Sequence, residues 1–266
     1  MSDSQLEQLV EKAQSGDRPA LEATVRQIQD QVYRLSIRML VDPEQALAAS
    51  QEILILVVTK LSTFQGKSRF RTWVYRVALN YLLQQKRAPQ LSFEFFQNDL
   101  LDGLTEPEPR LAEDEALLNE VRVACTMAML LCLDAEHRAA YVLGEILELG
   151  HEEASEIQGT SPANFRQRLS RARREVLEFT SKNCGLSNPE AACHCRKRIE
   201  PALAKNRIRP GSLVFSRGAP EFSEVTRKAQ TLVGDLKALQ LQKSGPLFHS
   251  PKDFGQQLSA LLDTGN

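Results

Sequence analysis

One short segment of the chain combines aromatic rings, cations and a glycine. It reads Phe64-Gln65-Gly66-Lys67-Ser68-Arg69-Phe70-Arg71-Thr72-Trp73-Val74-Tyr75-Arg76. Residues 60–90 hold seven Lys and Arg but no Asp or Glu, in a chain whose net charge is −1. Cations follow the phosphates of single-stranded nucleic acid, and aromatic rings stack on its unpaired bases. The segment therefore predicts a single-strand surface formed by Phe64, Gln65, Gly66, Lys67, Ser68, Arg69, Phe70, Arg71, Trp73, Arg76 and Asn80.

The same segment has a plainer interpretation, a solvated helix face with Trp73 as its anchor. Trp73, Val74, Val77, Ala78 and Tyr81 repeat at helical spacing, so Trp73 is expected in the core. The other side of that helix carries arginines and no acid. This unbalanced charge favours a polyanionic partner over a merely solvated face.

A second basic segment, residues 163–174, holds five arginines and no acid. Gly159 ends one predicted helix, and Ser161 with Pro162 begins the next, which is the order of a helix-turn-helix. An ordinary helical hairpin would mix both charges on its outer face. The pattern therefore predicts contacts to duplex DNA from Ser161, Asn164, Arg166, Gln167, Arg168, Ser170, Arg171 and Arg174, opposite a buried stripe of Phe165, Leu169, Ala172 and Val176.

The third group of reactive side chains is Cys184, Cys193, His194 and Cys195. Three thiols and an imidazole can supply a tetrahedral zinc set, so zinc is the one cofactor that the sequence indicates. Residues 193–195 are consecutive and cannot all reach one metal without strain, so His249 or another chain is an alternative fourth ligand. Reduced cysteines on a surface turn and a redox-sensitive thiol pair are the two alternatives.

Helical periodicity runs through the first two-thirds of the 266-residue chain and predicts an all-α fold. Caps and prolines place the expected starts and stops. The first helices are expected over residues 6–13, from Asp17 through Met39 and from Asp42 to Leu61, followed by a helix that contains Trp73 and ends at about Arg87.

The stretch 88–110 interrupts that periodicity with prolines, a glycine and acids, so it is expected to be a flexible acidic linker. Residues 91–120 carry nine acids and one arginine, while Phe93, Phe95 and Phe96 indicate that the linker lies on a protein surface. The expected organisation is two small helical domains, 1–88 and 111–182, a linker at 89–110, and a distinct C-terminal extension at 183–266 with amphipathic segments near 221–242 and 252–263.

Composition excludes several classes of protein. No apolar run approaches the roughly 20 residues that span a bilayer, so no membrane insertion is expected. The N-terminus is polar and unlike a signal peptide, and five cysteines, an odd number, argue against a secreted disulfide framework. A reducing cytoplasm is the expected setting. No phosphate-binding glycine loop, nucleophile elbow or clustered His/Glu set indicates an enzyme.

The order of these motifs resembles bacterial RNA polymerase sigma factors of the sigma-70 family, extracytoplasmic-function type. Gly16-Asp17, Asp42-Pro43-Glu44, Gln51-Glu52 and the Phe64–Arg76 string are similar to that family's first conserved domain. The family's second domain is similar to three further stretches of this chain: Asp134-x-x-His137-Arg138, Glu152-Glu153-x-x-Glu156-Ile157 and the string from Phe165 to Arg173. The resemblance covers roughly residues 5–180 and leaves the extension outside.

The resemblance implies that the first domain binds core RNA polymerase and melts the −10 promoter element, and that the second reads the −35 element as duplex. It implies a polymerase contact through Asp42, Glu44, Gln51 and Glu52, and an anti-sigma factor as a further partner. Residues 45–50 lack the acids usual in the family, and residues 53–58 are almost wholly aliphatic. These departures favour an alternative, a helix-turn-helix regulator that does not bind core polymerase, although such a protein needs no loop like Phe64–Trp73.

Overall fold

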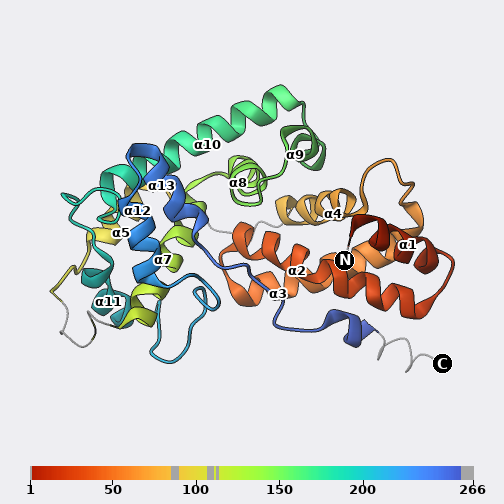
Figure 1. Ribbon diagram of the computed structural model, residues 1–266, viewed down its shortest axis with the longest axis horizontal. Coiled ribbons are helices and arrows are strands. Elements are labelled where there is room, and N and C mark those ends of the chain that lie inside the picture. Colours follow the sequence, from red (N-terminus) through yellow and green to blue (C-terminus); the bar gives the residue numbers. More distant parts are fainter. Residues whose placement is uncertain (1, 85–89, 107–110, 112–113, 259–266) are drawn as a thin grey trace. The chain divides into compact units, whose positions relative to one another are not determined.

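The computed structural model describes residues 2–84, 90–106, 111 and 114–258, and every regular element among them is a helix (Figure 1). Packing divides the chain into two compact units. The first comprises Met1–Ala88, Leu149–Phe165 and Phe248–Asn266, and the second comprises Pro89–Glu148 and Arg166–Leu247. The domain boundaries expected from sequence at 88/89 and 110/111 involve residues outside the described part of the chain.

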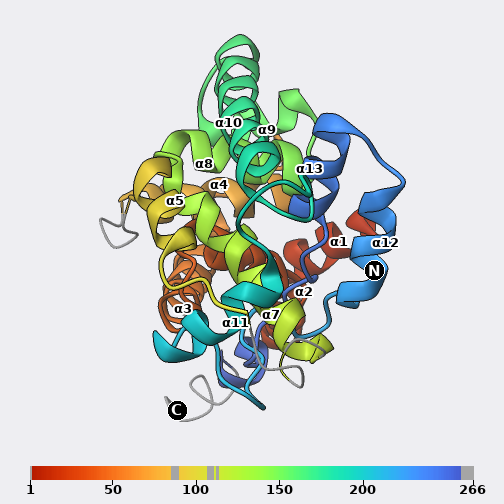
Figure 2. The same ribbon diagram turned by 90° about the vertical axis from the view of Figure 1, so that its left-hand side faces the viewer.

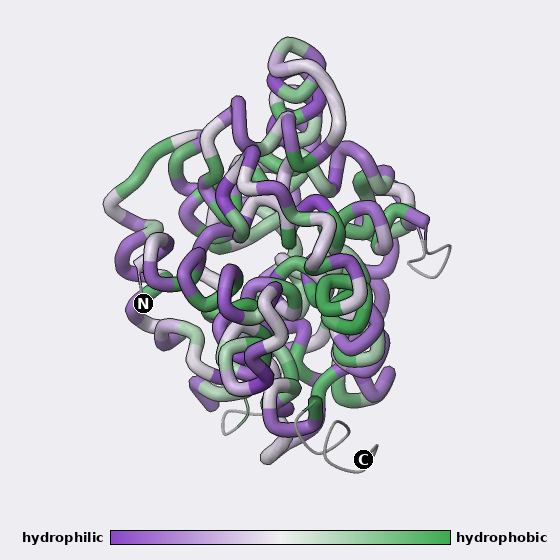
Figure 3. The backbone as a smooth tube through the Cα atoms, turned by 90° about the vertical axis from the view of Figure 1, so that its right-hand side faces the viewer, coloured by the Kyte–Doolittle hydropathy of each residue, from purple (hydrophilic) through white to green (hydrophobic). Residues whose placement is uncertain are grey.

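The first unit begins with α1 (Asp3–Gln14), α2 (Arg18–Leu40), α3 (Pro43–Thr59) and α4 (Phe70–Gln84). Asp17 and Asp42 cap α2 and α3 as expected, since each side chain accepts a hydrogen bond from a backbone N–H three residues later, at 2.9 Å. Hydrophobic and hydrophilic stretches follow one another along the helical coils of the chain (Figure 3). The apolar stripes meet in a core that includes Leu6, Val10, Ile28, Leu35, Ile53, Val74 and Ala78.

One of the expected helix ends differs from the structure. The third helix stops at Thr59, and one 3-10 turn, η1 (Leu61–Thr63), carries the chain toward the basic loop. The fourth helix, which contains Trp73 as expected, begins at Phe70 and is described to Gln84, so Arg87 lies outside the described residues.

Two later segments complete the first unit. Helix α9 (His151–Gln158) packs against α4. The segment that follows Phe248 lies along α2, where the side chains of Phe248 and Phe254 are buried.

The second unit contains α5 (Phe93–Leu101), α7 (Glu115–Met129), the 3-10 turn η2 (Leu130–Cys132), α8 (Ala135–Tyr141), the π-helical turn η3 (Val142–Ile146), and α10 (Pro162–Asn183) from Arg166 onward. The extension adds α11 (Cys195–Ala204), α12 (Phe222–Gln230) and α13 (Gly234–Lys243). Figure 2 shows α11 lying across α7.

A helix occupies the middle of the segment that sequence predicts to be a linker. Ser92 caps α5 by accepting a hydrogen bond from the Phe95 N–H at 3.0 Å. Phe96 is buried, and its ring stacks on Phe179 at 5.5 Å between centroids. The phenylalanines expected to lie on a protein surface therefore include one that packs in the chain's own second unit.

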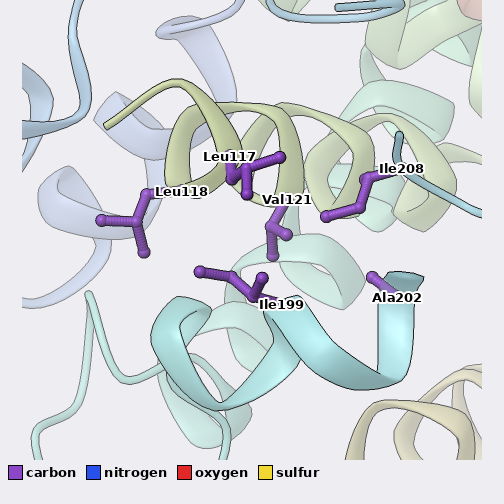
Figure 4. Close-up of a cluster of buried hydrophobic side chains, with 6 residues drawn as sticks. All are labelled: Leu117, Leu118, Val121, Ile199, Ala202 and Ile208. Carbon is purple, nitrogen blue, oxygen red and sulfur yellow. The ribbon is translucent and has the colours of Figure 1, made fainter. Parts of the chain in front are cut away.

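The extension, expected from sequence as a distinct part, shares core residues with the second unit. Leu117, Leu118 and Val121 of α7 pack against Ile199 and Ala202 of α11, with Ile208 beside them (Figure 4). Within the described residues, no helix combines the length and apolar character that crossing a bilayer requires.

Candidate nucleic-acid and polymerase surfaces

The basic loop between η1 and α4 is anchored at its base and exposed at its tip. The Gln14 side-chain amide donates hydrogen bonds to the carbonyl oxygens of Leu61 and Phe64, both at 2.9 Å. Gly66 has a φ of +69°, a conformation that residues with a Cβ seldom adopt. The exposed residues of the loop are Gln65, Gly66, Lys67 and Arg69, and Ser68 is half-buried.

Three aromatic rings form a cluster under this loop. The Phe70 and Trp73 rings stack with centroids 5.6 Å apart, and Phe64 contacts both, at 5.2 and 5.6 Å. The expectation that Trp73 belongs to the core is wrong, because Trp73 is half-buried while Phe70 is only 1% exposed. Phe64 and Trp73 therefore present ring surface beside the exposed tip, whereas Phe70 supports them from below.

The cations of α4 are not equally available. Arg71 bonds to the Asp3 carboxylate at 3.1 Å and to the Gln31 side chain at 3.2 Å, and it is half-buried. Its contacts tie α4 to α1 and α2, so its first role is structural. Lys67 and Asn80 are exposed, and the described residues offer neither of them an ion pair or side-chain hydrogen bond.

Helix α9 supplies carboxylates to the other arginines of this surface. Arg69 pairs with Glu153 at 2.5 Å, and Arg76 pairs with Glu156. The Thr72 hydroxyl donates a hydrogen bond to Glu153 at 2.6 Å. Sequence reasoning misses these partners, because no local pattern in residues 151–158 indicates which distant helix their acids face.

A tight turn joins α9 to α10. Gly159 ends α9 in the left-handed conformation, with a φ of +62°, and the Thr160 N–H donates to the Ser155 carbonyl at 3.0 Å. Ser161 then caps α10, accepting from the Asn164 N–H at 3.2 Å. The predicted buried stripe of α10 is confirmed, since Phe165, Leu169, Ala172 and Val176 are each at most 3% exposed.

The arginines of α10 fall into two groups. Arg168 pairs with Glu136, and Arg173 pairs with the buried Glu145 at 2.5 Å. The remaining predicted duplex contacts on this helix are all exposed: Asn164, Arg166, Gln167, Ser170, Arg171 and Arg174. Within the described residues, the three arginines of this group have no ion pair.

The predicted polymerase contacts lie on α3. Glu44, Gln51 and Glu52 are exposed, and Asp42 is the half-buried cap of the helix. Ile55 shares their face, one turn beyond Gln51, and is 48% exposed. Sequence reasoning does not single out Ile55, because it sits in an aliphatic run whose buried and exposed members look alike.

The cysteine cluster has a defined backbone arrangement. An isolated β-bridge pairs Cys184 with Cys193, and the Gly185 N–H donates to the Cys193 carbonyl at 2.8 Å. The His194 ring packs against Gly185 so closely that a Cβ there would lie 2.4 Å from Nδ1. Among the described residues, no three or more His, Cys, Asp or Glu side chains are arranged to hold a metal ion.

Burial governs the acidity of these thiols. It raises the pKa of Cys193 to about 11, and it raises the pKa of Cys184 and Cys195 as well. Cys125 of α7, which sequence reasoning does not include, has a pKa raised well above its ordinary value by burial and by the three other thiols. Protonated thiols are poor nucleophiles, so this environment does not favour the redox-sensor interpretation.

The fold and these surfaces define a helical nucleic-acid-binding protein with a helix-turn-helix. Comparison with known families is more specific. The sigma-70 region 2 family matches residues 24–90, and the sigma-70 region 4 family matches residues 124–176.

Similar proteins are themselves sigma factors. The chain is 30% identical over 187 residues to the RNA polymerase sigma-H factor of Pseudomonas aeruginosa, covering 66% of this chain and 94% of that protein. It is 30% identical over 179 residues to the ECF RNA polymerase sigma-E factor of Escherichia coli, covering 63% and 90%. Identity to RNA polymerase sigma factor YlaC of Bacillus subtilis is 27% over 166 residues, covering 62% and 95%.

The chain belongs to the sigma-70 family of RNA polymerase sigma factors and is of the extracytoplasmic-function type. It directs RNA polymerase to promoters and is not an enzyme, and its partners are core polymerase and promoter DNA. Both family matches end by residue 176, so the extension lies beyond them.

Proposed function

We propose that the loop from Phe64 to Arg69 and the exposed edge of α4 hold the unpaired strand of the melted −10 element. The supporting observation is that Gln65 and Lys67 are exposed around Gly66, beside the accessible rings of Phe64 and Trp73. Rings that can stack on a base, next to cations that can reach its phosphates, suit unpaired DNA. Phe70 and Arg71 support this surface from within and do not contact the strand directly.

Replacing Gln65, Lys67 and Ser68 together with alanine tests this role. Open-complex formation on a promoter should fall, while binding to core polymerase stays unchanged, because the substituted side chains do not lie on α3. A matched control replaces the exposed Gln8 and Lys12 of α1 with alanine. These substitutions remove one amide and one cation elsewhere in the first unit. Normal promoter melting by the triple variant would refute the proposal.

The proposed duplex reader is α10, which lies in the major groove of the −35 element. Arginines without an intramolecular partner can pair with guanine edges or phosphates, and within the described part of the chain Arg166, Arg171 and Arg174 meet that condition. Arg168 is held by Glu136, so its part in DNA binding requires that this ion pair open.

Core polymerase is proposed to bind the face of α3 that bears Glu44, Gln51, Glu52 and Ile55. The linker expected at 91–110 is proposed to contact polymerase and not DNA, and within it Asp99, Asp102 and Glu106 already pair with cations of the extension. Phe95, which is 57% exposed, is the residue from which a crosslink to polymerase is expected. Crosslinks mainly to duplex DNA would contradict this assignment.

Family membership sets aside the alternative of a helix-turn-helix regulator that ignores polymerase. A sigma factor acts on RNA polymerase, so the cytoplasm is the proposed compartment, and an anti-sigma factor remains a proposed partner. No metal enters the proposal, because the described cysteines and His194 are not arranged to hold one.

A further inference from the structure

The acidic side of α9 lies on the surface proposed to bind single-stranded DNA. Glu153 binds both the Arg69 guanidinium, at 2.5 Å, and the Thr72 hydroxyl, at 2.6 Å. One turn further along α9, Glu156 binds Arg76, which is one turn beyond Thr72 on α4. Two carboxylates at i and i+3 thus follow a row of donors along one edge of α4.

These donors are of the kind that bind phosphate oxygens. Arginine and threonine side chains make many of the backbone contacts in protein–DNA complexes, and a carboxylate offers them oxygens of the same charge sign. The Glu153 side chain is 19% exposed and the Arg69 side chain 58% exposed, so the carboxylate is the more enclosed partner.

Apolar contacts hold α9 in place independently of its acids. Ala154 and Ile157, which alternate with the two glutamates, are fully buried, and the His151 ring contacts the buried Phe165 ring at 5.9 Å. The charged contact therefore belongs to a packed helix and not to a freely moving surface segment.

The fit between α9 and Arg76 is incomplete. Arg76 pairs with Glu156 through one terminal nitrogen, while its buried Nε has no hydrogen-bond partner within the described residues. A phosphate can accept two parallel hydrogen bonds from a guanidinium, including one from Nε. A DNA phosphate at this position would satisfy a donor that α9 leaves unpaired. The additional hydrogen bond favours exchange of the helix for the strand.

We propose that α9 occupies the single-strand DNA surface when DNA is absent, with Glu153 and Glu156 standing in for phosphates. This inference rests on the proposed function of that surface. DNA binding then requires Arg69, Thr72 and Arg76 to exchange carboxylates for phosphates. Because the turn at Gly159 joins α9 directly to α10, departure of α9 also frees the first turn of the helix proposed to read the −35 element.

The test compares the full chain with its Glu153→Gln, Glu156→Gln variant, which keeps side-chain shape and removes both charges. The matched control is Glu152→Gln, an exposed acid of the same helix for which the described residues offer no ion pair. The probe is a fluorescent oligodeoxythymidine of about 16 nucleotides, which suits a sequence-tolerant single-strand surface, followed by anisotropy. Circular dichroism confirms that each variant is folded.

The double variant should bind the oligonucleotide about 5- to 30-fold more tightly than the wild type at roughly 0.1 M salt, as expected from losing two modest competing ion pairs. The Glu152→Gln control should change affinity by less than about twofold, through net charge alone. A double variant that binds no more tightly than this control overturns the inference.

A further pair of substitutions separates failure of the inference from failure of the proposed function. Arg69→Ala and Arg76→Ala, added to the double variant, should abolish its gain. If the gain persists, the strand binds elsewhere and the proposed DNA surface is wrong. If the double variant shows no gain, yet the two arginine substitutions still weaken binding, the surface binds DNA but α9 does not compete for it.

Discussion

Arg171 and Arg174 differ from Arg168 and Arg173 in whether a carboxylate already neutralises them. The first pair is exposed and without an ion pair in the described part of the chain, while Glu136 and Glu145 hold the second pair. An arginine already bound to an acid must break that contact before it can contact DNA. The unpaired arginines are therefore the residues whose loss should affect DNA binding most directly.

Arg171→Ala should weaken binding to a duplex bearing the −35 element by about 1–3 kcal/mol, if Arg171 pairs with a guanine edge. Fluorescence anisotropy on matched and mismatched duplexes measures the effect. Lys182→Ala, at the exposed far end of the same helix, is the control and should change binding little. An equal loss on every sequence, with a smaller dependence on salt, would mean that Arg171 contacts only phosphate.

The capping residues Asp17, Asp42 and Ser161 were predictable, because a cap depends on three or four neighbouring residues. Sequence alone did not predict whether Phe70 or Trp73 is the core residue. The two residues are three positions apart on α4, so helical periodicity alone does not show that Phe70 is the more buried of the two.

At the scale of elements, α5 is held by cations from the extension. The Arg198 guanidinium donates to the carbonyl oxygens of Asp99, Leu100 and Asp102 at 3.0–3.3 Å, where the helix ends with unpaired acceptors. The Asp99 carboxylate also binds Lys205 at 3.3 Å and Arg207. A cation at a helix C-terminus is favoured by the helix dipole as well as by these hydrogen bonds.

These contacts predict how α5 responds to pH. The hydrogen bond from Arg207 lowers the pKa of Asp99 to about 2, below the ordinary 3.8. The stabilising contribution is therefore complete above pH 3.8 and is lost as pH falls from 3.8 toward 2. Asp99→Asn should destabilise the second unit against urea at pH 7, and the difference from wild type should shrink below pH 3.8. A difference that stays constant down to pH 2 would contradict this account.

Helix α3 carries its proposed function on one exposed stripe. Ile55 is an apolar side chain among acids and amides, and exposed aliphatic residues in such surroundings are typical of protein interfaces. The stripe depends only on helical spacing, yet sequence alone could not reveal it. Residues 53–58 are nearly all aliphatic, and packing against α2 determines which of them are buried.

Ile55→Ser should weaken binding of core polymerase by about 1–2 kcal/mol, because the contact loses buried apolar area, without lowering the thermal stability of the free protein. The affinity is measured by titrating the variant onto core polymerase that is immobilised on a surface. Val233→Ser, at an 80% exposed position outside α3, is the control. Unchanged affinity would place the polymerase contact away from Ile55.

For the whole molecule, the extension is part of both packing units. In the second unit, the buried Glu120 of α7 accepts hydrogen bonds from the backbone N–H groups of Val214, Phe215 and Ser216 at 2.8–3.0 Å. In the first unit, Arg34 donates to the Phe248 carbonyl at 2.8 Å. The extension therefore supplies structure to the segments that carry the sigma-70 matches.

Sequence patterns predicted the helical class and the helix-turn-helix, because both depend on local spacing, and the family resemblance supplied the order of the two conserved segments. They did not predict the packing of α11 on α7, the location of α9 beside α4, or the contact between residues 248–254 and α2. Those contacts join residues far apart in the chain, and no local periodicity encodes them. The candidate DNA surface was identified by composition, but its acidic partners required the three-dimensional structure.

The C-terminal segment is fastened to α2 by several different contacts. Arg26 pairs with Asp253 at 3.0 Å, the His249 ring lies 2.6 Å from Asp30, and Phe254 is buried. Gly255 approaches α2 so closely that a Cβ would lie 2.4 Å from Arg26 Cγ and 3.0 Å from the Glu22 carbonyl oxygen. This contact combines apolar burial with a backbone fit that only glycine permits.

Ending the chain after Leu247 should therefore raise amide hydrogen exchange along α2 while leaving α11 protected, since only the first unit loses contacts. Local exchange is the appropriate measurement, because a chain with two packing units need not unfold in one step. Phe254→Ala should give the same pattern with a loss of about 2–4 kcal/mol, and Gly255→Ala should weaken the contact while retaining both phenylalanines. A chain ended after Gln257 keeps the contacts described here and is the control. If α2 is equally protected in all of these variants, the C-terminal segment does not stabilise the first unit.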